Sequence, residues 1–175
     1  MNDTGDFWVF GYGSLMWRPG FEFIERRIAS VHGYHRSLCI YSHVHRGTPE
    51  HPGLVLGLDR GGSCKGVAFR VSGAFRAATV AYLRERELVT SVYEEKWISV
   101  DLGDGRPRVP ALCYVVDRRH AQYAGKLGRE RSLQLVRQGV GGSGANPEYV
   151  LNTYAHLVEL GLHDADLAWY CAHLT

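Results

Sequence analysis

The 175-residue sequence lacks the features of membrane, secreted and nucleic-acid-binding proteins. No apolar run approaches the length of a membrane span, and the polar N-terminus has neither the basic nor the apolar region of a signal peptide. The formal net charge is only +2 and no run of basic residues stands out, which argues against binding to nucleic acid or to an anionic membrane. We therefore expect a cytoplasmic protein that has neither nucleic acid nor a membrane as a partner.

Cysteine motifs and metal-ligand spacings are also missing. The four cysteines are far apart in the sequence and form no CxxC pair: Cys39, Cys64, Cys113 and Cys171. We expect buried free thiols, as in a reducing compartment, and not a metal frame. His43, His45 and His51 lie close together, but no carboxylate or cysteine with a familiar ligand spacing accompanies them, so we predict no metal site.

The most informative stretch that is present lies near the N-terminus. The apolar and aromatic run Phe7–Phe10 predicts a buried strand, and Gly11-Tyr12-Gly13 predicts a sharp turn after it. Backbone N–H groups in such a turn suit a carboxylate or a polarised carbonyl oxygen. Met16 occupies the position of the third glycine of a dinucleotide-binding fingerprint, and Ser14 is not in a nucleophile elbow. A glycine-rich turn without a ligand remains the alternative.

The order of predicted elements indicates an α+β fold. Six short strands are expected in the first two-thirds of the chain, at Phe7–Phe10, Ser37–Tyr41, Leu54–Leu58, Lys65–Val71, Trp97–Leu102 and Ala111–Val116. Turn signals separate them, among them Gly61-Gly62. We therefore predict a small mixed or antiparallel β-barrel with peripheral helices, in a single domain over residues 1–175 whose first six residues form a disordered lead.

Four helices are expected around this barrel. They are Phe75–Leu88, Gly125–Gln138, a helix from Asn146 to about Gly161, and Asp164–Leu174. Asn146-Pro147-Glu148 combines an N-cap, a proline at the first helical position and an early acid, which is typical of a helix start. A flexible stretch, Gly139–Gly144, is expected to precede it.

Glu87 is the most informative residue of the first predicted helix. Helical spacing puts it on the face of Leu83 and Val80, which is expected to pack inward. A carboxylate on an apolar face has a raised pKa unless it is paired, and such groups serve as proton shuttles. The alternative is a structural ion pair with Lys96 or a neighbouring arginine.

Five elements occur in one order along nearly the whole chain. They are Trp8-Val9-Phe10-Gly11-Tyr12-Gly13-Ser14-Leu15, His45-Arg46-Gly47-x-Pro49, Gly66-Val67-Ala68-Phe69-Arg70, Tyr82-Leu83-x-x-Arg86-Glu87 and Asn146-Pro147-Glu148-Tyr149. On these elements the chain resembles the ChaC-like gamma-glutamylcyclotransferase family, in particular its glutathione-specific branch. The resemblance implies a small β-barrel with peripheral helices, in agreement with the prediction from the residues.

The resemblance also implies an activity. A glutathione-specific gamma-glutamylcyclotransferase is a lyase of glutathione catabolism: the glutamyl α-amine attacks the γ-amide carbonyl and releases 5-oxoproline and Cys-Gly, without a cofactor. Glu87 matches the catalytic general acid and base. The substrate-binding positions implied are Tyr12, Gly13, Ser14, Leu15, Arg46 and Tyr149. Cyclotransfer on another γ-glutamyl amine, and a non-catalytic module that binds a small carboxylate, remain open, as do the oligomeric state and the role of Tyr93.

Overall fold

The computed structural model describes residues 5–88 and 90–175, in two compact units. The first unit comprises residues 1–36 and 58–117, and the second comprises residues 37–57 and 118–175. The single domain expected over residues 1–175 stays a prediction. Of the predicted disordered lead, residues 1–4 lie outside the described residues, and Asp6 accepts a hydrogen bond from the Gly73 N–H at 3.0 Å.

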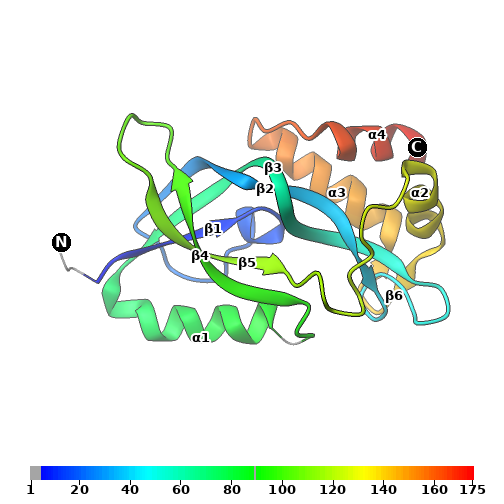
Figure 1. The fold of residues 1–175 in the computed structure, drawn as a ribbon, viewed down its shortest axis with the longest axis horizontal. Coiled ribbons are helices and arrows are strands. Elements are labelled where there is room, and N and C mark those ends of the chain that lie inside the picture. Colours follow the sequence, from blue (N-terminus) through cyan, green and yellow to red (C-terminus); the bar gives the residue numbers. More distant parts are fainter. Residues whose placement is uncertain (1–4, 89) are drawn as a thin grey trace. The chain divides into compact units, whose positions relative to one another are not determined.

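Five strands close into a mixed barrel (Figure 1). They are β1 (Phe7–Gly11), β2 (Glu25–Ser42), β3 (Gly53–Val71), β4 (Tyr93–Asp101) and β5 (Val109–Val116), in the spatial order β1-β3-β2-β4-β5. β1 runs antiparallel to β3 and parallel to β5, and β4 runs antiparallel to both β2 and β5. The predicted fold class is therefore confirmed.

The strand boundaries differ most from the prediction at two places. The expected turn at Gly61-Gly62 is wrong: β3 continues through both glycines, whose φ angles are 98° and 67°. Because glycine adopts this left-handed conformation without a steric cost, the irregularity is absorbed within one long strand. β2 begins at Glu25, twelve residues before the predicted start at Ser37, because its first part carries charged residues that hide the strand pattern.

Helix α1 (Arg76–Glu87) packs on the barrel of the first unit (Figure 1). Leu83 is fully buried and Val80 partly so, and both belong to an apolar cluster with Phe7, Leu112 and Tyr114. The helical face predicted to point inward therefore does so. This packing fixes the end of α1, where Glu87 lies, relative to β1 and β5 of the same unit.

The start of α1 is prepared by a 3-10 turn, η2 (Gly73–Phe75). The Ser72 hydroxyl caps this turn by accepting a hydrogen bond from the Ala74 N–H at 3.3 Å. The α-helix proper follows at Arg76, one residue after the predicted start at Phe75.

The second unit contains α2 (Arg129–Gln138), α3 (Asn146–Glu159) and α4 (Ala165–Leu174), which pack on one another. The predicted start of α2 at Gly125 is wrong, because the chain stays non-helical until the extended Gly128. The stretch predicted as flexible, Gly139–Gly144, contains instead strand β6 (Val140–Gly141) and the first residue of its partner β7 (Gly144–Ala145).

Asn146 corrects a further expectation. Ala145 is the N-cap of α3, and the buried Asn146 side chain turns away to bond both backbone groups of Leu54. Its Oδ1 accepts from the Leu54 N–H at 2.8 Å and its Nδ2 donates to the Leu54 carbonyl, also at 2.8 Å. Asn146 thus pairs with strand β3 as a neighbouring strand would. Pro147, predicted at the first helical position, is the second residue of α3, and Glu148 lies in the first turn as predicted.

The cysteine thiols can be compared with the expectation that they are free and buried. All four cysteines are free, with Cys39, Cys64 and Cys113 buried and Cys171 partly exposed. No helix in the described part of the chain is long and apolar enough to cross a membrane.

Candidate active site

The turn that follows β1 contains backbone N–H groups that have no partner among the described residues. It forms a single 3-10 turn, η1 (Ser14–Met16), closed by hydrogen bonds from the Met16 N–H to the Gly13 carbonyl (2.9 Å) and from the Arg18 N–H to the Ser14 carbonyl (2.8 Å). Within residues 5–88 and 90–175, the N–H groups of Gly13, Ser14 and Leu15 donate no hydrogen bond. Three consecutive bare donors and the exposed Ser14 hydroxyl suit an anionic or carbonyl oxygen.

Two neighbours hold this turn in place. A Cβ atom on Gly11 would lie 2.8 Å from the Leu15 Cβ, so the close turn needs glycine there. The buried guanidinium of Arg36 donates from Nε to the Tyr12 carbonyl (2.6 Å) and from Nη2 to the Lys65 carbonyl (2.7 Å). Arg36 therefore fixes the turn to β3, a role that no sequence signal indicated.

Glu87 lies at the last residue of α1 with its carboxylate largely withdrawn from water. Its side chain is 18% exposed, and burial raises the pKa of Glu87, while the positive charge of Arg86 acts in the opposite direction. The predicted alternative of an ion pair is partly realised: Arg86 Nε lies 3.6 Å from Glu87 Oε1, whereas Lys96 pairs with Glu94. A carboxylate with a raised pKa is a stronger base than an ordinary one, which suits it to accept a proton and to return it.

Arg86 connects Glu87's helix to the turn. Its Nη2 donates to the Ser14 hydroxyl at 2.8 Å, and its Nη1 donates to the Arg18 carbonyl at 2.6 Å and to the Pro19 carbonyl at 3.2 Å. The bare donors of the turn and the desolvated carboxylate are thus joined through one guanidinium. The pattern Arg86-Glu87 was visible in the sequence, but nothing in it indicated this contact.

A second carboxylate, Glu95 on β4, has a different environment. Arg84 donates to it twice, from Nε at 3.0 Å and Nη2 at 2.9 Å, and the Tyr114 hydroxyl donates at 2.9 Å. The hydrogen bond from Arg84 is the largest cause that lowers the pKa of Glu95, and the bond from Tyr114 acts in the same direction. Glu95 is therefore held ionised and fully paired.

Arg46 and Tyr149, the other predicted substrate-binding residues, belong to the second unit. The Arg46 guanidinium lies 5.4 Å from the centre of the Tyr149 ring, and its Nη1 donates to the Ala145 carbonyl at 3.1 Å. The Tyr149 hydroxyl accepts a hydrogen bond from the Leu56 N–H at 3.0 Å. The structure thus brings these two residues together, and both make contacts that support the backbone around them.

The three clustered histidines show no common centre. His45 Nδ1 lies 3.1 Å from the Ser143 hydroxyl, and the His43 ring stacks on Tyr41. Among the residues that the structure describes, no group of three or more His, Cys, Asp or Glu side chains is arranged to hold a metal ion.

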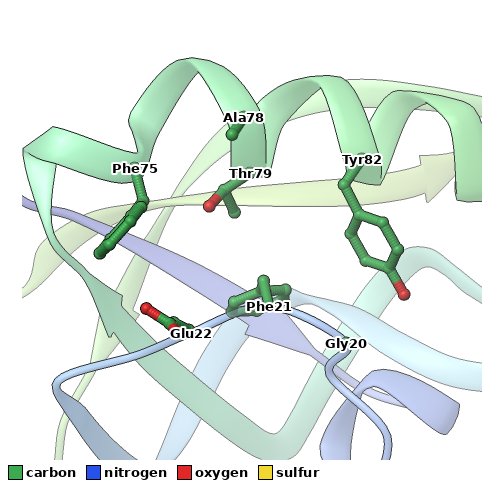
Figure 2. A pocket seen from close by; sticks show the side chains of 7 residues that line it. All are labelled: Gly20, Phe21, Glu22, Phe75, Ala78, Thr79 and Tyr82. Atoms are coloured by element: carbon green, nitrogen blue, oxygen red, sulfur yellow. The ribbon is translucent and has the colours of Figure 1, made fainter.

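A cavity of about 310 Å³ lies between α1 and the segment Gly20–Glu22 (Figure 2). Its lining comprises Gly20, Phe21, Glu22, Phe75, Ala78, Thr79 and Tyr82. None of the predicted site residues lines this cavity, so it does not include the turn residues Gly13–Leu15 or Glu87. Tyr82 is nevertheless a link, because Arg86 Nη1 also lies 3.1 Å from the Tyr82 hydroxyl.

Comparison with known proteins agrees with these motifs. Residues 7–171 match the sequence model of a family described as "ChaC-like protein". A protein named glutathione-specific gamma-glutamylcyclotransferase, from Escherichia coli (strain K12), is 36% identical over 165 residues, which span 94% of this chain and 71% of that protein. The Danio rerio glutathione-specific gamma-glutamylcyclotransferase 1 is 34% identical over 164 residues, spanning 91% of this chain and 82% of that one.

The fold has a close counterpart among solved structures. A crystal structure of the selenomethionine-labelled glutathione-specific gamma-glutamyl cyclotransferase from yeast superposes with a TM-score of 0.84. The superposition covers 97% of this chain and 96% of the yeast chain, at 20% sequence identity. At this identity the likeness establishes the shared fold.

Proposed function

Because the chain belongs to the ChaC-like family, we propose that it is a glutathione-specific gamma-glutamylcyclotransferase with Glu87 as its general acid and base. One observation carries the proposal: in the first unit, Arg86 links the largely buried carboxylate of Glu87 to a turn whose N–H groups have no partner among the described residues. The names of the bacterial and fish relatives support glutathione as the substrate.

The chemistry needs only proton transfer and positioning. The glutamyl α-nitrogen forms a bond to the γ-carbonyl carbon, and the bond from that carbon to the cysteinyl nitrogen breaks, which gives 5-oxoproline and Cys-Gly. The attacking nitrogen must lose protons and the departing nitrogen must gain them. Glu87 accepts a proton from the first and returns one to the second, so no water is consumed. Burial prepares Glu87 for this exchange because it brings the two protonation states closer in free energy.

The turn supplies the positioning. The N–H groups of Gly13, Ser14 and Leu15 and the Ser14 hydroxyl bind the oxygens of the glutamyl group, which holds the chain of the substrate in a ring-closing pose. Because nucleophile and carbonyl already belong to one molecule, the turn has only to restrict the rotations of the glutamyl chain, and its contribution is the entropy of that restriction. In this proposal Arg46 and Tyr149 contact the substrate as the family motifs imply.

Incubation of the purified chain with glutathione tests the proposal. We expect equimolar 5-oxoproline and Cys-Gly, quantified by mass spectrometry. A panel of γ-glutamyl amino acids, run in parallel, tests the substrate: release of 5-oxoproline from the panel but not from glutathione would reassign the substrate. Binding of glutathione without any turnover would favour the non-catalytic alternative.

We further propose that the protein is cytoplasmic and that its substrate is a small molecule. The four free cysteines support the location, because free thiols persist in a reducing compartment. Fractionation followed by immunodetection tests it, and recovery of the protein outside the cytoplasm would contradict it.

A further inference from the structure

Arg86 makes more contacts with the predicted turn than with the carboxylate beside it. Three of its hydrogen bonds reach Ser14, Arg18 and Pro19, which are 67 to 72 positions away in the sequence. By contrast, its approach to Glu87 is a 3.6 Å ion pair. A neighbouring arginine that served only to neutralise Glu87 would direct its N–H groups at that carboxylate, as Arg84 does at Glu95.

The contact with Ser14 determines which way the hydroxyl can act. A hydroxyl group has one proton to donate and two lone pairs, whereas a guanidinium only donates. Since Arg86 Nη2 donates to the Ser14 oxygen at 2.8 Å, the proton of Ser14 is free to point toward a third group. Ser14 is exposed, so that third group can be a ligand. Ser14 therefore keeps its proton to donate, and the positive charge of Arg86 beside it repels an ammonium group, so a carboxylate or carbonyl oxygen is the favoured partner.

We infer that Arg86 is a positioning residue: it orients the Ser14 hydroxyl as a donor to a substrate oxygen and anchors the Ser14–Pro19 segment to the end of α1 that carries Glu87. This inference rests on the proposed function for the identity of the substrate. It goes beyond that function in assigning to Arg86 both the geometry of the turn and the selectivity of Ser14 for oxygen.

Arg86 also sets the charge near Glu87. The charged and titratable groups that act on or respond to Glu87 are Arg86 on the same helix and Cys113 and Tyr114 on β5. Both β5 groups have pKa values raised chiefly by burial, so they stay neutral, and Arg86 alone among these groups opposes the effect of burial on Glu87. Removal of the Arg86 charge must therefore raise the pKa of Glu87 further.

The kinetic test uses Arg86→Gln, Arg86→Lys, Ser14→Ala and the double variant Ser14→Ala/Arg86→Gln. We expect KM for glutathione to rise about tenfold or more in Arg86→Gln and in Ser14→Ala, with the double variant within about twofold of the worse single variant. The acidic limb of kcat against pH moves to higher pH in Arg86→Gln and stays in place in Ser14→Ala and Arg86→Lys. Multiplicative effects in the double variant, or an unchanged KM in Arg86→Gln, would overturn the inference.

A matched control comes from the other end of α1. Arg76 is exposed and its Nη1 lies 3.4 Å from the Gly5 carbonyl, so Arg76→Gln removes an arginine from the same helix without touching the turn. We expect Arg76→Gln to leave KM and the acidic limb unchanged. A similar rise in KM in Arg76→Gln would show that the effect of Arg86→Gln is a general loss of helix stability, and would also overturn the inference.

Hydrogen exchange without substrate separates this inference from the proposed function. The Met16 and Arg18 amides are hydrogen-bonded within the turn, and we expect them to exchange at least tenfold faster in Arg86→Gln than in Arg76→Gln. If wild-type protein releases no 5-oxoproline, the proposed function fails, while faster exchange still supports the anchoring role. Equal exchange in both variants overturns that role whatever the activity.

Discussion

Glu87 and Glu95 are two carboxylates in the first unit, each beside an arginine of α1, and their environments are opposite. Glu95 accepts two hydrogen bonds from Arg84 and one from Tyr114, and its pKa is lowered, chiefly by the bond from Arg84. Glu87 receives only a longer ion pair from Arg86, and burial raises its pKa. An adjacent arginine therefore does not define the role of a carboxylate; what matters is where that arginine directs its N–H groups.

Of the substitutions at these two carboxylates and their partners, Glu87→Gln is expected to have the largest effect. We expect kcat for 5-oxoproline release to fall by at least about 100-fold, because a positioned acid and base typically contributes that much or more. Initial rates with saturating glutathione measure the effect. Glu85→Gln, an exposed position on the same helix, is the matched control and should retain wild-type activity. Full activity in Glu87→Gln would assign the proton transfer to another group.

Removal of the second carboxylate should affect stability more than catalysis. In Glu95→Gln the buried Tyr114 hydroxyl loses its bond to a charged partner, which we expect to lower the free energy of unfolding by about 1.5 kcal/mol. Urea unfolding at neutral pH measures the loss. A fall in kcat as large as that of Glu87→Gln, in folded protein, would contradict the separation of roles.

The two carboxylates should also respond to pH in opposite directions. Because the pKa of Glu87 is raised above 4.5 on folding, the native state binds more protons there, and its ionisation lowers stability as pH rises through the folded pKa. The pKa of Glu95 is lowered below 4.5, so its contribution is present above that pH and is lost as pH falls through the folded pKa.

Thermal unfolding from pH 4 to pH 7 tests this. As pH rises, the stability of Glu87→Gln should increase relative to wild type. The stability of Glu95→Gln should decrease relative to wild type over the same range. Parallel curves for the two variants would show that their environments are alike.

The smallest effect is expected for Arg84→Gln. Arg84 is well exposed, so its ion pair with Glu95 is screened by solvent and salt. We expect a smaller loss of stability than in Glu95→Gln, and one that shrinks further as the salt concentration of the urea titration is raised. A loss equal to that of Glu95→Gln would show that the exposed ion pair with Arg84, and not the buried bond from Tyr114, accounts for the stability that Glu95 provides.

Local patterns in the sequence were sufficient for the helical face of α1 and for the turn after β1. The spacing of Val80, Leu83 and Glu87 is enough to place them on one face, because an α-helix has a fixed period. The two glycines around Tyr12 indicate a turn for a similarly local reason.

Contacts between distant segments cannot be predicted from local sequence patterns. Arg36 and Arg86 act on carbonyl and hydroxyl groups of residues 12–19, and the choice of partner depends on which strands and helices become neighbours. The continuous β3 was missed for a different reason. Two adjacent glycines indicate a turn in the sequence, and only strand pairing on both sides reveals that the ladder continues.

The pairing of Asn146 with Leu54 has a consequence for synthesis on the ribosome. Ninety-two positions separate these two residues, and each depends on the other for a pair of buried hydrogen bonds. While translation proceeds through the intervening codons, the backbone groups of Leu54 have no such partner. The second unit therefore reaches its native pairing only after most of the chain has been made.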